Sequence, residues 1–131
     1  MRTLDWLRNV TDTGPVDLRD DTRFRPRPGS PVSVQVMGPN SLDVLLARDI
    51  ALKGVGVNVP HQFRDCNVDA EVEIVITLPG QRPFLARGQV RHRTANYGDS
   101  RFFGIEFVEL PSQRREQIRR YLSSGMPQRI N

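Results

Sequence analysis

Apolar and polar residues alternate with a period of two through most of this 131-residue chain, from Val32 to Phe107. The alternation is most regular over residues 68–78, where every second residue is apolar. It is typical of β-strands with one buried face, because successive side chains of a strand point to opposite sides of the sheet. Six such segments follow one another with short turns and no helical pattern between them. The sequence therefore predicts a mainly β fold in which six antiparallel strands close, or nearly close, into a barrel.

The expected strands are separated by turns that contain the usual turn residues. Glycine lies in the turns at 38–41, 79–82 and 96–99, with proline in the first two. The turn at 51–54 ends on Gly54, which is the natural residue if the backbone there takes a positive φ. The six strands are expected at residues 32–36, 42–46, 55–59, 68–78, 84–93 and 103–107.

Helices are expected only at the two ends of the chain. Residues 3–10 predict a short helix with Thr3 as its cap. Residues 11–31 contain acids, arginines and four prolines without periodicity, so we expect an exposed, mobile connector. Pro111 opens a second helix that runs to about Ser123 and covers one end of the barrel. The predicted organisation is an N-terminal helix and connector at 1–20, the barrel with its C-terminal helix at 21–123, and a tail at 124–131.

Several functional classes are excluded by what the sequence lacks. No apolar run reaches the length of a membrane span, and Met1 is not followed by the apolar stretch of a signal peptide, so we expect a soluble cytoplasmic protein. Cys66 is the only cysteine, which leaves no intrachain disulfide. His61 and His92 have no partners at metal-ligand spacing. No nucleophile with a histidine base and no glycine-rich phosphate loop is recognisable. We therefore expect neither an enzyme nor a bound metal or other cofactor.

The charge of the chain favours an anionic partner only weakly. The net charge is +4, and Lys53 is the only lysine among 19 basic residues. A genome rich in guanine and cytosine favours arginine codons and explains this bias as well as selection for anion binding does. The positions of particular arginines are therefore more informative than their number.

Two short motifs carry the candidate chemistry. Arg23-Phe-Arg-Pro-Arg27 places two arginines four residues apart, and Asp49-Ile-Ala-Leu-Lys-Gly54 places an acid and a glycine at a strand turn. A guanidinium offers a planar fork that fits phosphate oxygens and the O6 and N7 acceptors of guanine. A carboxylate can accept hydrogen bonds from the N1–H and amino groups of the same base. The two motifs together favour a guanine nucleotide as the ligand.

These motifs are followed by Arg101-Phe-Phe-Gly-Ile-Glu-Phe-Val-Glu-Leu110 and an arginine-rich terminal segment. In this order they resemble the PilZ domain, the bacterial receptor module for cyclic di-GMP. The resemblance covers about residues 21–123 and implies a six-stranded barrel with a C-terminal helix. It further implies that Arg23 and Arg27 clamp phosphate and guanine, that Asp49 reads a guanine edge, and that Gly54 lets the nucleotide approach the backbone. Ala51 stands where many members of the family carry serine.

The expected function is therefore that of a cyclic di-GMP receptor that changes its N-terminal loop on binding and signals to an effector protein. Two alternatives remain open. A basic β-barrel that binds single-stranded nucleic acid needs exposed aromatic side chains, which only Phe24, Tyr97 and Phe102 can supply. Outward arginines on the strand at 84–93 and on the terminal helix suit such a surface, although rows of this kind more often form a solvated face. The other alternative is an adaptor with the PilZ fold that binds protein and no nucleotide.

Overall fold

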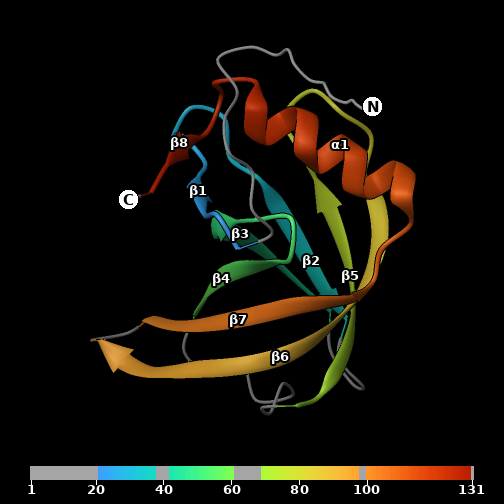
Figure 1. Cartoon of the computed structure of the whole chain (residues 1–131). Coiled ribbons are helices and arrows are strands. Elements are labelled where there is room, and N and C mark those ends of the chain that lie inside the picture. Colours follow the sequence, from blue (N-terminus) through green and yellow to red (C-terminus); the bar gives the residue numbers. More distant parts are fainter. Residues whose placement is uncertain (1–20, 38–41, 61–68, 98–99, 131) are drawn as a thin grey trace.

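Figure 1 shows the chain as a computed structural model, which describes residues 21–37, 42–60, 69–97 and 100–130. The helix predicted at residues 3–10 and the turn predicted at 38–41 lie outside the described residues. Strands predominate, as the alternating pattern predicts. The six long ones are β2 (Ser33–Met37), β3 (Leu42–Ile50), β4 (Gly54–Pro60), β5 (Glu71–Thr77), β6 (Phe84–Tyr97) and β7 (Ser100–Glu109).

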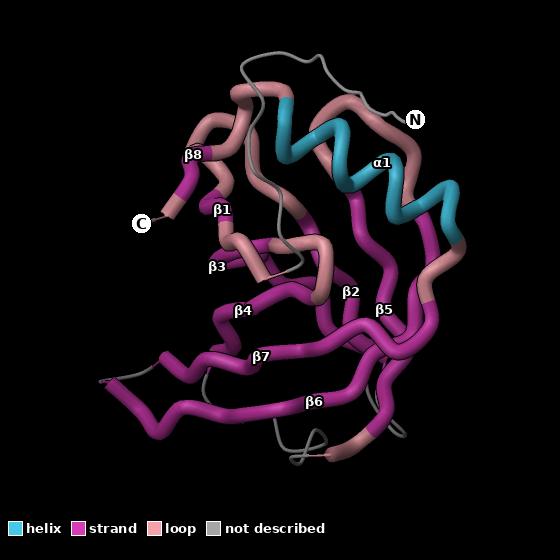
Figure 2. Tube along the Cα trace, in the orientation of Figure 1, coloured by secondary structure: helices cyan, strands magenta, loops and turns pink. Residues whose placement is uncertain are grey.

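These six strands form a closed barrel. Their order around the ring is β2, β5, β6, β7, β4 and β3, and a further pairing of β2 with β3 completes it. Every pairing in the ring is antiparallel. Figure 2 shows β6 and β7 as a long hairpin that runs away from the end of the barrel covered by the helix. The predicted six-stranded antiparallel barrel is confirmed.

The strand lengths differ from the prediction in one respect. The regular alternation at 68–78 predicts the longest strand there, but β5 has 7 residues and β6 has 14. Pairing between β6 and β7 shifts its register at three points. The residues after Val90 are mostly polar, so no apolar alternation in the sequence marks the continuation of β6 to Tyr97.

The core consists of the inward-facing residues of each strand. Val34, Val57, Ile74 and Phe103 come from four different strands and are completely buried. Their neighbours along the strands are polar, small or partly exposed. This separation is what a period of two produces when one face of each strand lines a barrel interior.

The helix α1 (Ser112–Ser123) begins directly after Pro111 and covers one end of the barrel. Its buried residues are Ile118, Tyr121 and Leu122. The Tyr121 hydroxyl has no hydrogen-bond partner among the residues that the structure describes. Burial raises the pKa of this tyrosine to about 12, because ionisation in an apolar environment is unfavourable. The side chain therefore stays un-ionised and packs within the core between the helix and the barrel.

Two short strands lie where the sequence predicts only a connector and a tail. These are β1 (Phe24–Arg25), which pairs with Ile50 of β3, and β8 (Gln128–Arg129), which pairs with β1. Phe24 is only 3% exposed, so this part of the predicted exposed connector is instead fixed to the barrel. Pairing with residues about a hundred positions later along the chain supplies backbone hydrogen bonds that the local sequence does not indicate.

Candidate functional site

A bulge in β3 determines where Asp49 points. Ala47 pairs with Val57 and Asp49 pairs with Gly56, so Arg48 is an extra residue without a partner in β4. Strict alternation from Leu45, which is buried, would turn Asp49 toward the core. The extra residue reverses the alternation, so Ile50 is fully buried and Asp49 lies on the outside of the barrel. The bulge thus presents the carboxylate of the second motif to the surface.

Arg23 reaches this carboxylate from the start of β1. Its Nη1 donates a hydrogen bond to Oδ1 of Asp49 over 2.7 Å. The Asp49 side chain is 13% exposed and the Arg23 side chain is 36% exposed, so the pair is partly shielded from water. The structure therefore joins the two motifs that sequence analysis singles out, although they are 26 residues apart.

Gly54 lies at the start of β4, but it is required for a reason other than the predicted positive φ. Among the described glycines, only Gly80 and Gly125 have a positive φ. A Cβ atom at Gly54 would lie 2.3 Å from the backbone oxygen of Ile105 on the neighbouring strand. The absence of a side chain allows β4 and β7 to approach each other here, and it leaves the backbone of the turn open on the outer side.

Ala51 and Arg27 lie apart from this pair. Ala51 is fully buried, and its N–H donates to the Gly54 carbonyl over 2.8 Å, which closes the turn between β3 and β4. Its methyl group therefore fills the core and supports the turn. Arg27 is exposed in a tight turn in which the Ser30 N–H bonds its carbonyl over 2.9 Å. Its side chain forms no ion pair with another described residue and does not line the cleft that contains Arg23.

That cleft lies on the outside of the barrel and has a volume of about 220 Å³. Its floor is backbone, because Gly54 and Gly104 contribute no side chains. Three charged residues of its wall were not predicted from the sequence, namely Lys53, Arg91 and Glu106. Signals were present, since Lys53 is within the second motif and Arg91 is in the outward row of the strand at 84–93. The complete lining is Arg23, Lys53, Gly54, Arg91, Gly104, Ile105 and Glu106.

Glu106 is at the centre of the charged wall. Its Oε1 accepts a hydrogen bond from Nε of Arg91 over 2.6 Å, and its Oε2 lies 4.0 Å from Nζ of Lys53. Arg91 also lies 3.5 Å from Oδ1 of Asp69. The bond from Arg91 holds the pKa of Glu106 below its ordinary value, and the same bond raises the pKa of Arg91. Both groups are therefore charged at neutral pH.

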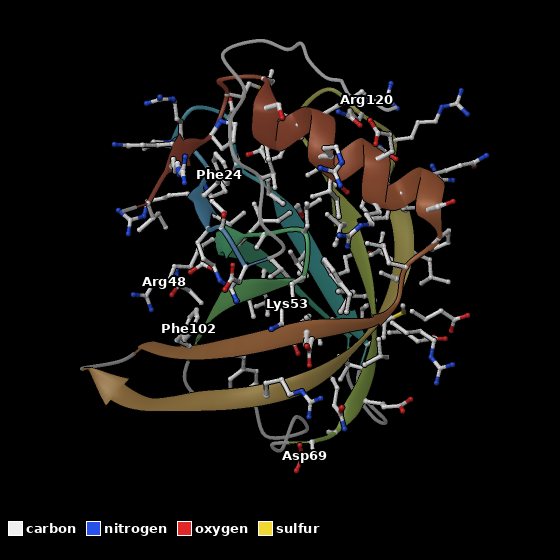
Figure 3. The ribbon with its side chains drawn as sticks, viewed as in Figure 1. Phe24, Arg48, Lys53, Asp69, Phe102 and Arg120 are labelled. Atoms are coloured by element: carbon white, nitrogen blue, oxygen red, sulfur yellow. The ribbon has the colours of Figure 1, made fainter. Side chains whose placement is uncertain are left out.

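An arginine and an aromatic ring extend the site along β3 and β7. The Arg48 guanidinium lies 4.5 Å from the centre of the Phe102 ring, a distance suited to a cation–π contact. Figure 3 shows these two side chains next to each other. The ring covers Gly56, where a Cβ atom would lie 2.5 Å from it. Phe102 is thus packed between glycine backbone and a cation, which restricts its ability to stack freely on a base.

Comparison with known proteins identifies the family. The sequence model of the PilZ domain matches residues 19–124 of this chain. The chain belongs to the PilZ domain family. No curated protein matches it significantly in sequence.

Solved structures share the fold. The inhibitor of motility MotI (DgrA) of Bacillus subtilis has 18% identity and a TM-score of 0.67 over 84% of this chain and 54% of its own. YcgR of Escherichia coli in complex with c-di-GMP has 16% identity and a TM-score of 0.63 over 78% of this chain and 43% of its own. The PilZ domain of YcgR with c-di-GMP has 14% identity and a TM-score of 0.64 over 78% of this chain and 86% of its own. The chain thus matches about half the length of the first two proteins.

The described part of the chain contains no helix with the length and apolar character needed to cross a bilayer.

Proposed function

We propose that this protein is a non-catalytic cytoplasmic receptor for cyclic di-GMP. The observation that carries the proposal is the outer cleft in which Arg23, hydrogen bonded to Asp49, lies beside the open backbone of Gly54. Membership of the PilZ family and the c-di-GMP complexes of YcgR support the choice of nucleotide.

The proposed roles follow from the chemistry of each group. Arg23 and Arg27 bind phosphate oxygens and the Hoogsteen edge of guanine with their planar forks. Asp49 accepts hydrogen bonds from guanine N1–H and the amino group once Arg23 has turned toward the nucleotide. The Gly54 backbone lies against the ligand. Ala51 contributes through the turn that it closes with Gly54 rather than through its side chain.

Titration calorimetry with cyclic di-GMP tests this function directly. We expect metal-independent binding and a clear preference over cyclic di-AMP, GMP and GTP. Adenine lacks the O6 acceptor and the N1–H donor that Arg23 and Asp49 recognise, so the guanine preference should be large. Equal affinity for cyclic di-AMP would contradict the assignment of Asp49, and an absence of heat with cyclic di-GMP would contradict the function itself.

We further propose that the nucleotide orders the chain N-terminal to the barrel and so creates a surface for an effector protein. The support is compositional, since residues 11–21 contain few apolar side chains while both motif arginines follow soon after. Because β1 is already paired, we expect the change to lie before and after Phe24 rather than at it. The predicted helix at 3–10 would move with this segment.

Hydrogen exchange measures this switch. We expect fast exchange in residues 11–21 of the free protein and slower exchange when cyclic di-GMP saturates the site. Trp6 is the only tryptophan, so its fluorescence reports on the same segment. Identical exchange with and without the nucleotide, in a sample that calorimetry shows to be saturated, would refute the switch and leave the binding function intact.

Binding of single-stranded nucleic acid is not favoured by the aromatic residues that the structure describes. Phe24 is buried in the core and Phe102 is packed against Gly56 and Arg48. A stacking platform requires aromatic faces that bases can reach. The calorimetric experiment distinguishes the receptor from the adaptor alternative, because an adaptor of that kind binds no nucleotide.

A further inference from the structure

The cleft has three cationic side chains, of which Arg23 and Lys53 lie within the two motifs and Arg91 lies outside both. Arg23 lies just before β1, Lys53 lies in the turn before β4, and Arg91 lies on β6, which β7, β4 and β3 separate from β1 in the sheet. Arg91 is itself the extra residue of a bulge, because Val90 pairs with Ile105 and His92 pairs with Gly104. Bulges often re-aim side chains beside binding sites. Lys53 and Arg91 thus form a second cationic group of the cleft, and Glu106 contacts both of them.

This second group is already occupied by a carboxylate. Glu106 bonds Arg91 over 2.6 Å and lies 4.0 Å from Lys53, and Asp49 holds Arg23 in the same way over 2.7 Å. The cations of the cleft are therefore satisfied internally in the free protein. A cyclic dinucleotide carries two phosphodiester charges on opposite sides of its ring. Two anionic groups entering this cleft must compete with two carboxylates.

We propose that Lys53 and Arg91 bind the second phosphate of the cyclic dinucleotide, and that Glu106 is an internal competitor that this phosphate displaces. The inference rests on the proposed function and assigns a separate task to Lys53 and Arg91. Glu106 then sets the affinity of the site by making the free state more favourable. It also prevents Lys53 and Arg91 from capturing simple anions, since a single phosphate without the rest of the nucleotide replaces Glu106 with little net gain.

The same two strands contain an internal control for this argument. Arg87 on β6 bonds Glu71 over 2.6 Å and Glu109 on β7 over 3.3 Å. Arg87 is about as exposed as Arg91, at 48% against 49%, and its pKa is raised in the same direction by its carboxylate partners. Neither Arg87 nor Glu109 lines the cleft. The Arg87–Glu109 pair therefore has the same charges as the Arg91–Glu106 pair but lies outside the cleft.

Calorimetric titration with cyclic di-GMP tests the proposal on the full chain and four variants. We expect Glu106→Gln to tighten binding about fivefold, because the two cations no longer have to leave a carboxylate. Arg91→Gln should weaken it about tenfold or more, because a charge-assisted contact with phosphate is lost. The controls Glu109→Gln and Arg87→Gln should each change the affinity by less than about twofold, since they alter only distant charge that salt screens.

Salt dependence provides a second measurement on the same proteins. Each phosphate contact adds to the fall of affinity with ionic strength, so Arg91→Gln should show a shallower dependence than Arg87→Gln. If the wild type binds cyclic di-GMP but Arg91→Gln binds equally well, the second phosphate site is wrong and the receptor function stands. Weaker binding by Glu106→Gln would overturn the competitor role. No binding by the wild type would remove both the inference and the function on which it rests.

Discussion

Replacement of Arg23 by alanine is expected to weaken cyclic di-GMP binding by about 2 to 4 kcal/mol, which corresponds to about 30-fold to 1,000-fold in affinity. The guanidinium is the one motif group that both contacts Asp49 and lines the cleft, so its loss removes a bidentate donor and leaves ligand charge uncompensated. Lysine at this position should restore only part of the affinity, because it lacks the planar fork. Calorimetric titration measures all three proteins.

The matched control for this variant is Arg25→Ala. Arg25 is exposed, two residues away, and absent from the cleft, yet its replacement removes the same charge. We expect the affinity of Arg25→Ala to stay within about threefold of the wild type. The melting temperatures of both variants should remain close to the wild type, since a partly exposed ion pair contributes about 1 kcal/mol or less to stability. Equal losses of affinity in the two variants would show that net charge, rather than the geometry of Arg23, drives binding.

Replacement of Gly54 by alanine is expected to destabilise the fold by about 3 kcal/mol and lower the melting temperature by about 10 °C or more. The added Cβ would lie 2.3 Å from the Ile105 carbonyl oxygen and 3.1 Å from the Glu106 Cα. Both are backbone atoms of β7, which cannot rotate away as a side chain can. β4 must therefore separate from β7 along the floor of the cleft, and cyclic di-GMP binding should fall with it.

Gly29→Ala is the control for Gly54→Ala. A Cβ at Gly29 meets nothing within 4 Å, and this residue is not among those with a positive φ. We expect its thermal and denaturant unfolding to match the wild type, or to show a gain of up to about 1 kcal/mol from reduced freedom in the unfolded chain. Wild-type stability in Gly54→Ala would show that β4 and β7 can separate without cost, which would contradict the importance of their close approach at Ile105.

Most of the barrel can be predicted from the sequence because one physical rule applies along its strands. Val55 and Val57 face the interior, as do Phe103 and Ile105, and each is at most 2% exposed. A strand with one buried face must alternate in this way, and a slip of one residue would expose its entire apolar set. The terminal helix is equally readable, because Pro111 marks its start and Ile118, Tyr121 and Leu122 mark its buried side.

The positions at which the rule changes could not be predicted. A bulge is a single added residue whose presence depends on the pairing register with a neighbouring strand. Arg48 and Arg91 are such residues, and the sequence does not mark either as an insertion. Near Arg48 the alternation even suggests the wrong face, because Leu42, Val44 and Leu46 are exposed and Leu45 is buried. The first bulge turns Asp49 outward, where it holds Arg23, and the second lies in β6 at Arg91, a residue of the cleft wall. The resemblance of the motifs therefore predicts Arg23, Asp49 and Gly54 as site residues. It does not predict that Lys53, Arg91 and Glu106 lie next to them.

The pairing of β1 with β8 joins the two ends of the described chain directly beside Arg23, a residue of the cleft. The Ile130 N–H bonds the Arg23 carbonyl over 3.0 Å, and β8 is the last strand of the sheet. Detaching β8 therefore loosens the segment that aims Arg23. Thermodynamic reciprocity requires the converse, so a nucleotide that fixes Arg23 also makes β8 harder to peel from β1. A second macromolecule that binds the C-terminal strand can thus change the affinity of the cleft without any contact with the nucleotide.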